Sequence, residues 1–237
     1  MPRGLATATK AIDNNKSQQG PFVQRFKLRD GESAVVRFLE QGDEIAWAYV
    51  YQLPPAPNRK FGNYEPSLDQ DNDGTPCPFK ENLTGSPKIR AYLNLIWRDA
   101  PDYQKDEKGF NVKDASGKLI QSGVADRVVL WEVGQKVLQQ ISALDADLKG
   151  LSSRDFKIIR AGEGLQTSYT VYPIGDVAPL SKNDKALAEE KYDLNEFIVP
   201  KSYEDAKKLL EGESNIAAQE SAIDRAQNAN VFLNPNK

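Results

Sequence analysis

The segment from Lys88 to Asp99 (KIRAYLNLIWRD) constrains the fold more than any other part of the chain. Apolar and polar side chains alternate along it, and alternate residues of a β-strand point to opposite faces of a sheet. A strand with one fully apolar face needs a core to bury that face, so the segment predicts a sheet that is packed on one side. The apolar face comprises Ile89, Ala91, Leu93, Leu95 and Trp97.

Further segments of this kind predict a chain built mainly from β-strands. They are rich in β-branched and aromatic residues and are separated by Gly and Asp turns. The predicted fold class is mainly β (α+β): an OB-type Greek-key barrel with an inserted Pro-rich lobe and a helical C-terminal segment. A β-sandwich or jelly roll would fit the strands nearly as well. We expect strands at 22–29, 33–40, 45–53, 88–99, 124–131, 155–160 and 168–174, and helices at 134–144, 184–191, 203–210 and 214–226.

Composition divides the chain into three parts. Residues 1–20 are polar and basic, which is typical of a flexible arm. Residues 21–180 contain the strands, interrupted at 54–87 by a proline-rich stretch that is too long for a hairpin loop and predicts an inserted lobe. Residues 181–237 hold eight Lys and Arg against eleven Asp and Glu, which predicts a helical, mildly acidic C-terminal segment.

The residue types that are missing narrow the chemistry. The chain has no histidine and a single cysteine, Cys77, which removes the commonest general base and the usual zinc ligands. No phosphate-binding glycine loop or nucleophile motif is present. Asp69, Asp71 and Asp73 resemble the start of a calcium loop, but its twelfth position, which needs a Glu, is Lys80. We therefore expect no enzyme, no cofactor and no metal site.

Two features bear on where the chain acts. No apolar run approaches the ~20 residues that span a bilayer, and the N-terminus lacks the apolar region of a secretory signal. We therefore expect a protein of the cytoplasm that does not enter a membrane. The formal net charge is -3, so nucleic-acid binding would need clustered cations rather than a basic protein overall.

The strand at 45–53 carries the clearest candidate site. Alternation places Trp47, Tyr49 and Tyr51 on one face, and aromatic rings of this kind can stack on unpaired bases. The neighbouring strand at 88–98 places Lys88, Arg90 and Tyr92 on one face, where cations could neutralise phosphates. In both strands the alternative is ordinary: rings that fill a core, and cations that face water.

Loops and single cations complete the predicted interface. The proline-rich lobe interleaves basic and aromatic residues within a short stretch, a pattern that suits a flexible nucleic-acid strand, although it also suits a solvated loop. The lobe residues are Arg59, Lys60, Phe61 and Tyr64, a weaker cluster consists of Arg98, Tyr103 and Lys105, and Arg37, Arg127, Lys157 and Arg160 are single cations that could line the same groove.

A family resemblance joins these segments. The stretches GESAVVRFLE, DGTPCPF, KIRAYLNLIWRD, VLWEVGQKVLQQISAL and RDFKIIRAGEGLQTSYTVYPI follow one another in an order that resembles the single-stranded-DNA-binding, helix-destabilising protein of T4-like and related tailed bacteriophages. The similarity covers roughly residues 22–180, and the order of the segments carries it rather than any single motif.

The resemblance implies an OB-fold core that binds single-stranded DNA (ssDNA) without sequence preference in phage replication, recombination and repair, in the cytoplasm of the bacterial host. It also implies self-association on DNA through the basic N-terminal arm and recruitment of replication proteins by the C-terminal segment. One feature departs from the family. Its lobe holds a zinc ion through cysteines and a histidine, whereas the lobe here offers only Cys77.

Two other classes of function remain open from the residues alone. A phage virion or tail protein with a β-sandwich would need no cationic groove and would assemble without DNA. A metal-dependent enzyme acting on nucleic acid would use carboxylates such as Asp69, Asp71 and Asp73 to hold its ion.

Overall fold

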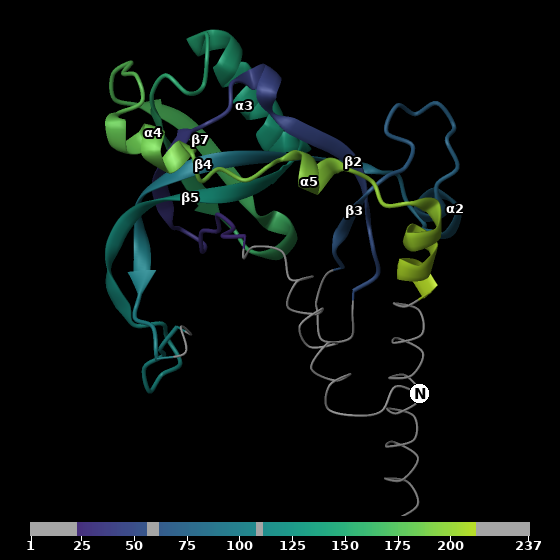
Figure 1. Ribbon diagram of the computed structural model, residues 1–237, viewed down its shortest axis with the longest axis horizontal. Helices are drawn as coiled ribbons and strands as arrows, with labels where there is room; N and C mark the ends of the chain where they lie inside the picture. The colour runs from purple at the N-terminus through teal and green to yellow at the C-terminus, as the bar shows by residue number, and fades with distance from the viewer. Residues whose placement is uncertain (1–22, 56–61, 108–110, 212–237) are drawn as a thin grey trace, which may run out of the picture.

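The computed structural model describes residues 23–55, 62–107 and 111–211 of the 237-residue chain (Figure 1). It shows a mixed α/β protein with a seven-stranded antiparallel sheet and a few helices. The predicted N-terminal arm at 1–20 and the predicted helix at 214–226 lie outside the described residues.

Most strands occur where alternation predicts them, but two are longer. The strand predicted at 88–99 extends to Tyr103, and the one predicted at 124–131 spans Gln121–Gly134. The segment predicted as a strand at 22–29 forms only an isolated bridge, Arg25 to Leu130. The elements are β1 (Ser33–Phe38), η1 (Gly42–Glu44), β2 (Ala46–Gln52), β3 (Tyr64–Pro66), α2 (Pro78–Asn82), β4 (Lys88–Tyr103), β5 (Gln121–Gly134), α3 (Gln135–Leu148), β6 (Asp155–Ala161), η2 (Gly164–Gln166), β7 (Ser168–Ile174), α4 (Lys182–Ala188) and α5 (Asn195–Ile198). Residues 203–211 are also helical, where a helix was predicted at 203–210.

Strand β4 organises the sheet because it pairs with three other strands. One edge pairs with β5 over nearly its whole length. The other edge is shared: residues 88–92 pair with β2, as in Ala46 opposite Tyr92, and residues 95–97 pair with β1, as in Phe38 opposite Leu95. The order β3-β2-β4-β1-β6-β7, with β5 also on β4, follows from this shared edge.

The sheet does not close into a barrel, which corrects the barrel expected from the sequence. Strand β7 pairs with β6, and no ladder joins β7 to β5 in the described residues. Helix α3 contacts both strands, and Trp131 of β5 meets Tyr169 of β7 edge to face with ring centroids 5.7 Å apart. Side-chain packing therefore fills the place where backbone pairing would complete a barrel. A two-sheet sandwich is not what the described strands form either.

The middle of the predicted apolar face of β4 is buried, while its ends, Ile89 and Trp97, are half-buried. Ala91, Leu93 and Leu95 have no exposed surface and share one core with Val36 and Phe38 of β1, under Ile141 of α3. The opposite face of β4 is covered by the C-terminal segment. Its Asn94 donates to the carbonyl of Tyr192 and accepts from the Tyr192 N–H, both at 3.0 Å.

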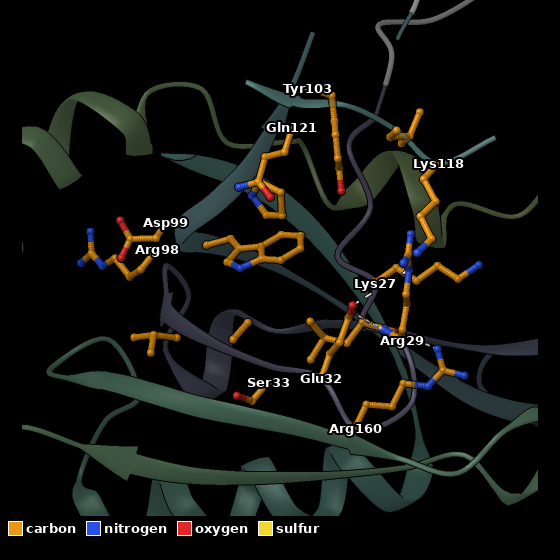
Figure 2. Close-up of a pocket in the computed structure, with 16 residues that line it drawn as sticks. Lys27, Arg29, Glu32, Ser33, Arg98, Asp99, Tyr103, Lys118, Gln121 and Arg160 are labelled. Carbon is orange, nitrogen blue, oxygen red and sulfur yellow. Dashed lines mark hydrogen bonds and ion pairs between the residues drawn. The ribbon is translucent and has the colours of Figure 1, made fainter. Parts of the chain in front are cut away.

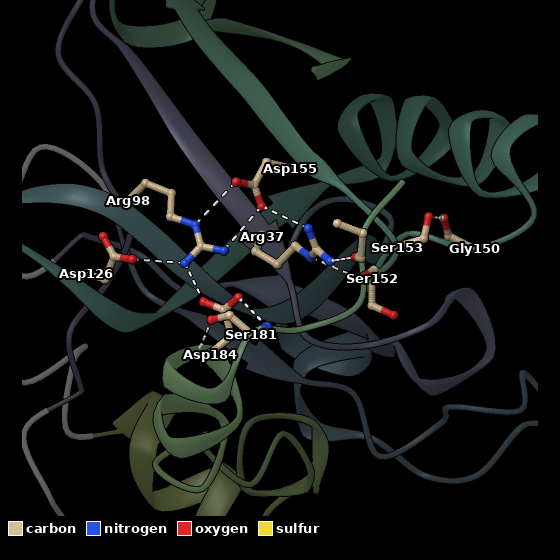
Figure 3. Close-up of polar contacts among 10 residues, drawn as sticks. Arg37, Arg98, Asp126, Gly150, Ser152, Ser153, Asp155, Ser181 and Asp184 are labelled. Atoms are coloured by element: carbon tan, nitrogen blue, oxygen red, sulfur yellow. Dashed lines mark hydrogen bonds and ion pairs between the residues drawn. The ribbon is translucent and has the colours of Figure 1, made fainter. Parts of the chain in front are cut away.

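An ion-pair cluster fastens α4 to the sheet (Figure 3). Arg98 of β4 donates to Asp126 of β5 at 2.9 Å, to Asp155 of β6 at 3.3 Å and to Asp184 of α4. Asp184 also caps its own helix, because its backbone N–H donates to the Ser181 hydroxyl while its carboxylate accepts from the Ser181 N–H. One guanidinium therefore links three elements that are distant in sequence.

We predict that acid weakens the fold through Asp184. Hydrogen bonds from Arg98 lower the pKa of this carboxyl from 3.8 to about 2. Because the folded pKa lies below the unfolded one, the stabilisation is complete above about pH 4 and is lost as the pH falls through about 2. Urea unfolding should therefore show that Asp184→Asn is less stable than wild type near neutrality by about 2 kcal/mol and has a flatter pH dependence between pH 4 and 2.

The matched control is Asp176→Asn, because Asp176 is exposed and forms no ion pair among the described residues. It should follow the wild-type curve. An Asp184→Asn curve with the wild-type slope below pH 4 would contradict the assignment of this stabilisation to Asp184.

Candidate functional site

The strand register separates two groups that the sequence suggested as one groove. Trp47 lies opposite Ala91 and Tyr49 opposite Ile89, whereas Ala48 lies opposite Arg90. Residues opposite each other in a sheet share a face. The aromatic residues of β2 and the cations of β4 are therefore on opposite faces of the sheet, and they cannot line one groove together.

The three aromatic residues of β2 have different surroundings. Trp47 is 49% exposed and meets Tyr49 edge to face, with ring centroids 5.5 Å apart. Tyr51 is buried in a small core with Cys77, Phe79 and Ala206, where its ring lies 6.2 Å from that of Phe79. Burial raises the Tyr51 pKa. Trp47 and Tyr49 remain surface residues, while Tyr51 belongs to a small core.

The cations at the start of β4 gather around Tyr64 of β3. The Arg90 guanidinium lies 4.0 Å and the Lys88 ammonium 5.7 Å from the Tyr64 ring centroid. Tyr92 is buried and stacks on Phe197 of α5 at 5.6 Å, and burial raises its pKa to about 12. The adjoining cavity is lined by two cations, Arg25 and Lys201, and by three carboxylates, Glu65, Glu132 and Glu196, so it does not favour a polyanion.

Two arginines of the predicted site stabilise the fold instead. Arg37 is 4% exposed, and its guanidinium donates to the carbonyls of Ser152 and Ala178 and pairs with Asp155 at 3.2 Å. Arg98 is held by the three aspartates described above, whose hydrogen bonds raise its pKa. Both charges are compensated inside the protein, so neither side chain is free to meet a ligand.

The calcium-like loop is closed by a lysine. The Lys80 ammonium lies 2.9 Å from the carboxylate of Asp69, which also accepts from the Gly74 N–H. The hydrogen bond from Lys80 lowers the Asp69 pKa. No three metal-binding side chains converge in the described parts of the chain. Arg59, Lys60 and Phe61 lie outside those parts.

Tyr103 and Lys105 belong to a cleft that the sequence did not delineate. After Trp97 the register of β4 shifts, Asp99 adopts φ 49°, and the β4–β5 hairpin turns away from β1. Cavities of about 920 and 290 Å³ lie beneath the hairpin and share Lys27, Trp97, Pro101 and Tyr103 in their walls. We call these two cavities together the hairpin cleft.

The hairpin cleft is lined mainly by cations. Figure 2 shows Lys118 of the hairpin pointing toward Lys27 and Arg29, with Arg160 beside them. Three carboxylates, Glu32, Asp99 and Asp102, face eight cations. The cations are Arg25, Lys27, Arg29, Arg98, Lys105, Lys118, Arg127 and Arg160.

Four of these cations have no carboxylate partner among the described residues: Lys27, Lys105, Lys118 and Arg160. The Arg160 guanidinium donates to the Leu28 carbonyl and, at 3.3 Å, to the Thr167 hydroxyl, which fixes its position without cancelling its charge. Uncompensated cations in a concave surface produce a positive potential that attracts anions.

Two half-buried rings stand beside these cations. Trp97 packs edge to face on the buried Phe26 at 5.1 Å, and Tyr103 follows it on the hairpin. The packing against Phe26 fixes the orientation of the indole, while part of its surface remains accessible. The hairpin cleft therefore combines aromatic surface with uncompensated positive charge.

Part of this cleft could have been predicted from the sequence, because apolar and cationic residues alternate between residues 26 and 29. Phe26 and Leu28 are buried, while Lys27 and Arg29 between and beyond them are exposed. This period-two pattern marks a segment with one face on the core and a cationic face outward. Lys118 carried no comparable signal, because its position depends on the path of the hairpin.

No protein-family model matches the chain, and no curated protein matches it significantly. No helix among the described residues has the length and apolar character needed to cross a membrane.

We predict a fixed order of solvent access for the three tryptophans. Trp47 is 49% exposed, Trp97 is half-buried and Trp131 is 2% exposed. In variants that keep one tryptophan and carry Phe at the other two positions, acrylamide should quench Trp47 most and Trp131 least. Stronger quenching of Trp131 than of Trp97 would contradict the placement of Trp97 at the cleft.

Proposed function

We propose that the protein binds single-stranded DNA, without sequence preference and without catalysis, in the hairpin cleft. The observation that carries the proposal is the meeting of uncompensated cations, Lys27, Lys118 and Arg160, with the accessible part of the Trp97 ring. Cations neutralise phosphates of any sequence, and rings stack on any base at ~1–3 kcal/mol each. The ligand must be single-stranded, because the base faces of a duplex are already stacked.

The strand order supports an OB-type fold as the finer description of the sheet. The strands β5-β4-β1-β6-β7 are neighbours in that order, α3 follows β5, and β1 pairs with both β4 and β6. An OB-fold is a five-stranded, partly open Greek-key barrel that binds oligonucleotides on its second and third strands. Those strands correspond here to β4 and β5, whose hairpin roofs the cleft.

The biological role that we propose comes from the resemblance in sequence order to the phage proteins. In that role the protein covers ssDNA during phage replication, recombination and repair in the host cytoplasm. By preferring single strands it shifts the melting equilibrium of a duplex toward separated strands. Partner proteins would engage the C-terminal segment, and copies of the protein would associate on DNA through the N-terminal arm.

We predict that oligo-dT binding depends on the cations of the hairpin cleft. The double variant Lys27→Gln/Lys118→Gln should weaken binding by tenfold or more at low salt. Each lysine lost should also reduce the slope of log affinity against log salt by about 0.7 to 1, because fewer counterions are released. Fluorescence titration across a salt series measures both effects.

The matched control is Lys88→Gln, which removes an exposed cation next to Tyr64, away from the cleft. It should leave affinity and salt slope within twofold of wild type. If Lys88→Gln lost affinity while the double variant did not, the interface would lie on the β2–β4 surface instead. Salt-independent binding, or none, would refute the proposal.

A further inference from the structure

One edge of the hairpin cleft is formed by a strand with a free side. The ladder between β1 and β4 begins at Val36, opposite Trp97, whereas the ladder between β1 and β6 begins at Ser33. From Ser33 to Val35, β1 thus has a neighbouring strand on the β6 side only. These residues line the larger cavity, so the free side of β1 is a wall of the cleft.

The bonding pattern fixes which backbone groups face this side. The Leu39 N–H donates to the Asn94 carbonyl of β4, so the odd-numbered residues of β1 point toward the β4 side. On the other side, the Arg160 N–H donates to the Glu32 carbonyl, so the even-numbered residues point toward β6. The N–H and C=O of Ser33 and of Val35 therefore point to the β4 side, and all but the Val35 carbonyl, which adjoins the bridge between Val36 and Trp97, are directed toward the cleft.

The short length of this edge decides what it can hold. A peptide that adds as a strand needs several consecutive residues of open edge, and β1 offers only two that point the right way. A nucleobase needs one donor and one acceptor side by side, because each base carries such a pair along its edge. The nearby rings of Trp97 and Tyr103 suit the flat faces of a base.

We propose that the free edge of β1 between Ser33 and Val35 receives the hydrogen-bonding edge of an unpaired nucleobase, with the phosphates held by Lys27, Arg29, Lys118 and Arg160. This rests on the proposed binding of ssDNA and adds the orientation of the strand. Bases point inward to β1 and the backbone follows the cations. Because the donor and the acceptor belong to the backbone, they favour no single base strongly.

The orientation is tested with wild-type protein and oligonucleotides of equal length and charge. The reference is oligo-dT. Oligo-N3-methyl-dT keeps the ring face but loses the N3–H donor at the hydrogen-bonding edge, and oligo-dU lacks only the C5 methyl group, which lies outside that edge. We expect N3-methylation to weaken binding about tenfold, because it leaves a backbone carbonyl unpaired, and oligo-dU to bind within twofold of oligo-dT.

The outcomes separate the two proposals. Equal affinity for oligo-dT and oligo-N3-methyl-dT would overturn the base orientation and leave ssDNA binding intact. An equal loss with oligo-dU and oligo-N3-methyl-dT would also overturn it, because the base edge would then not be the part that is read. If oligo-dT itself does not bind, the proposed function fails first.

A pair of variants tests the same edge from the protein side. Ser33→Pro removes the N–H at the first residue of β1, a position where proline is tolerated in strands, while Ser33→Ala changes only the exposed side chain. We expect Ser33→Pro to weaken oligo-dT binding, because a carbonyl oxygen of the base loses its backbone donor, and Ser33→Ala to match wild type. A folded Ser33→Pro protein that binds oligo-dT as tightly as wild type would overturn the assignment to this edge.

Discussion

The shared edge of β4 is the constraint on which the rest of the structure depends. One strand edge offers a fixed number of backbone groups, and here β2 pairs with residues 88–92 and β1 with residues 95–97. Where β1 ends its pairing at Val36, β4 leaves the sheet with β5 as a hairpin. The cleft exists because two strands that pair at one end must separate at the other, and backbone groups of β1 are left facing the gap.

Packing and ion pairing then determine the positive charge of this gap. Phe26 and Leu28 are buried in the core that lies under α3, which directs Lys27 and Arg29 outward into the cleft. Arg98 lies where the hairpin leaves the sheet and forms ion pairs with Asp126, Asp155 and Asp184. It therefore holds the base of the hairpin and the C-terminal segment together. Arg37 and Arg98, whose charges are compensated by aspartates, support the fold, whereas Lys27, Lys105, Lys118 and Arg160, which have no carboxylate partner among the described residues, leave the cleft positively charged.

Sequence reasoning predicted the parts that depend on local pattern and failed where distant segments had to be aligned. The apolar face of β4, helix α3 and strand β7 follow from periodicity, which burial of alternate residues imposes on any sheet. The prediction that Trp47 and Arg90 line one groove was wrong. Which residues of two strands share a face depends on the register between the strands, and the register cannot be read from the sequence of one strand. The sequence predicted Tyr92 as a surface ring, but Phe197 of α5 stacks on it.

The sequence by itself determined which face of β4 packs on the main core, that a helix follows the longest hairpin, and that no histidine can act and no disulfide can form within the chain. These properties depend on residue types and on spacings of a few residues. Tertiary structure alone decided that Lys27, Lys118 and Arg160 meet in one cleft. It also decided that the Arg37 guanidinium is buried and bonded to backbone carbonyls. Those outcomes depend on strand register and chain path, which are set by contacts between residues far apart in the sequence.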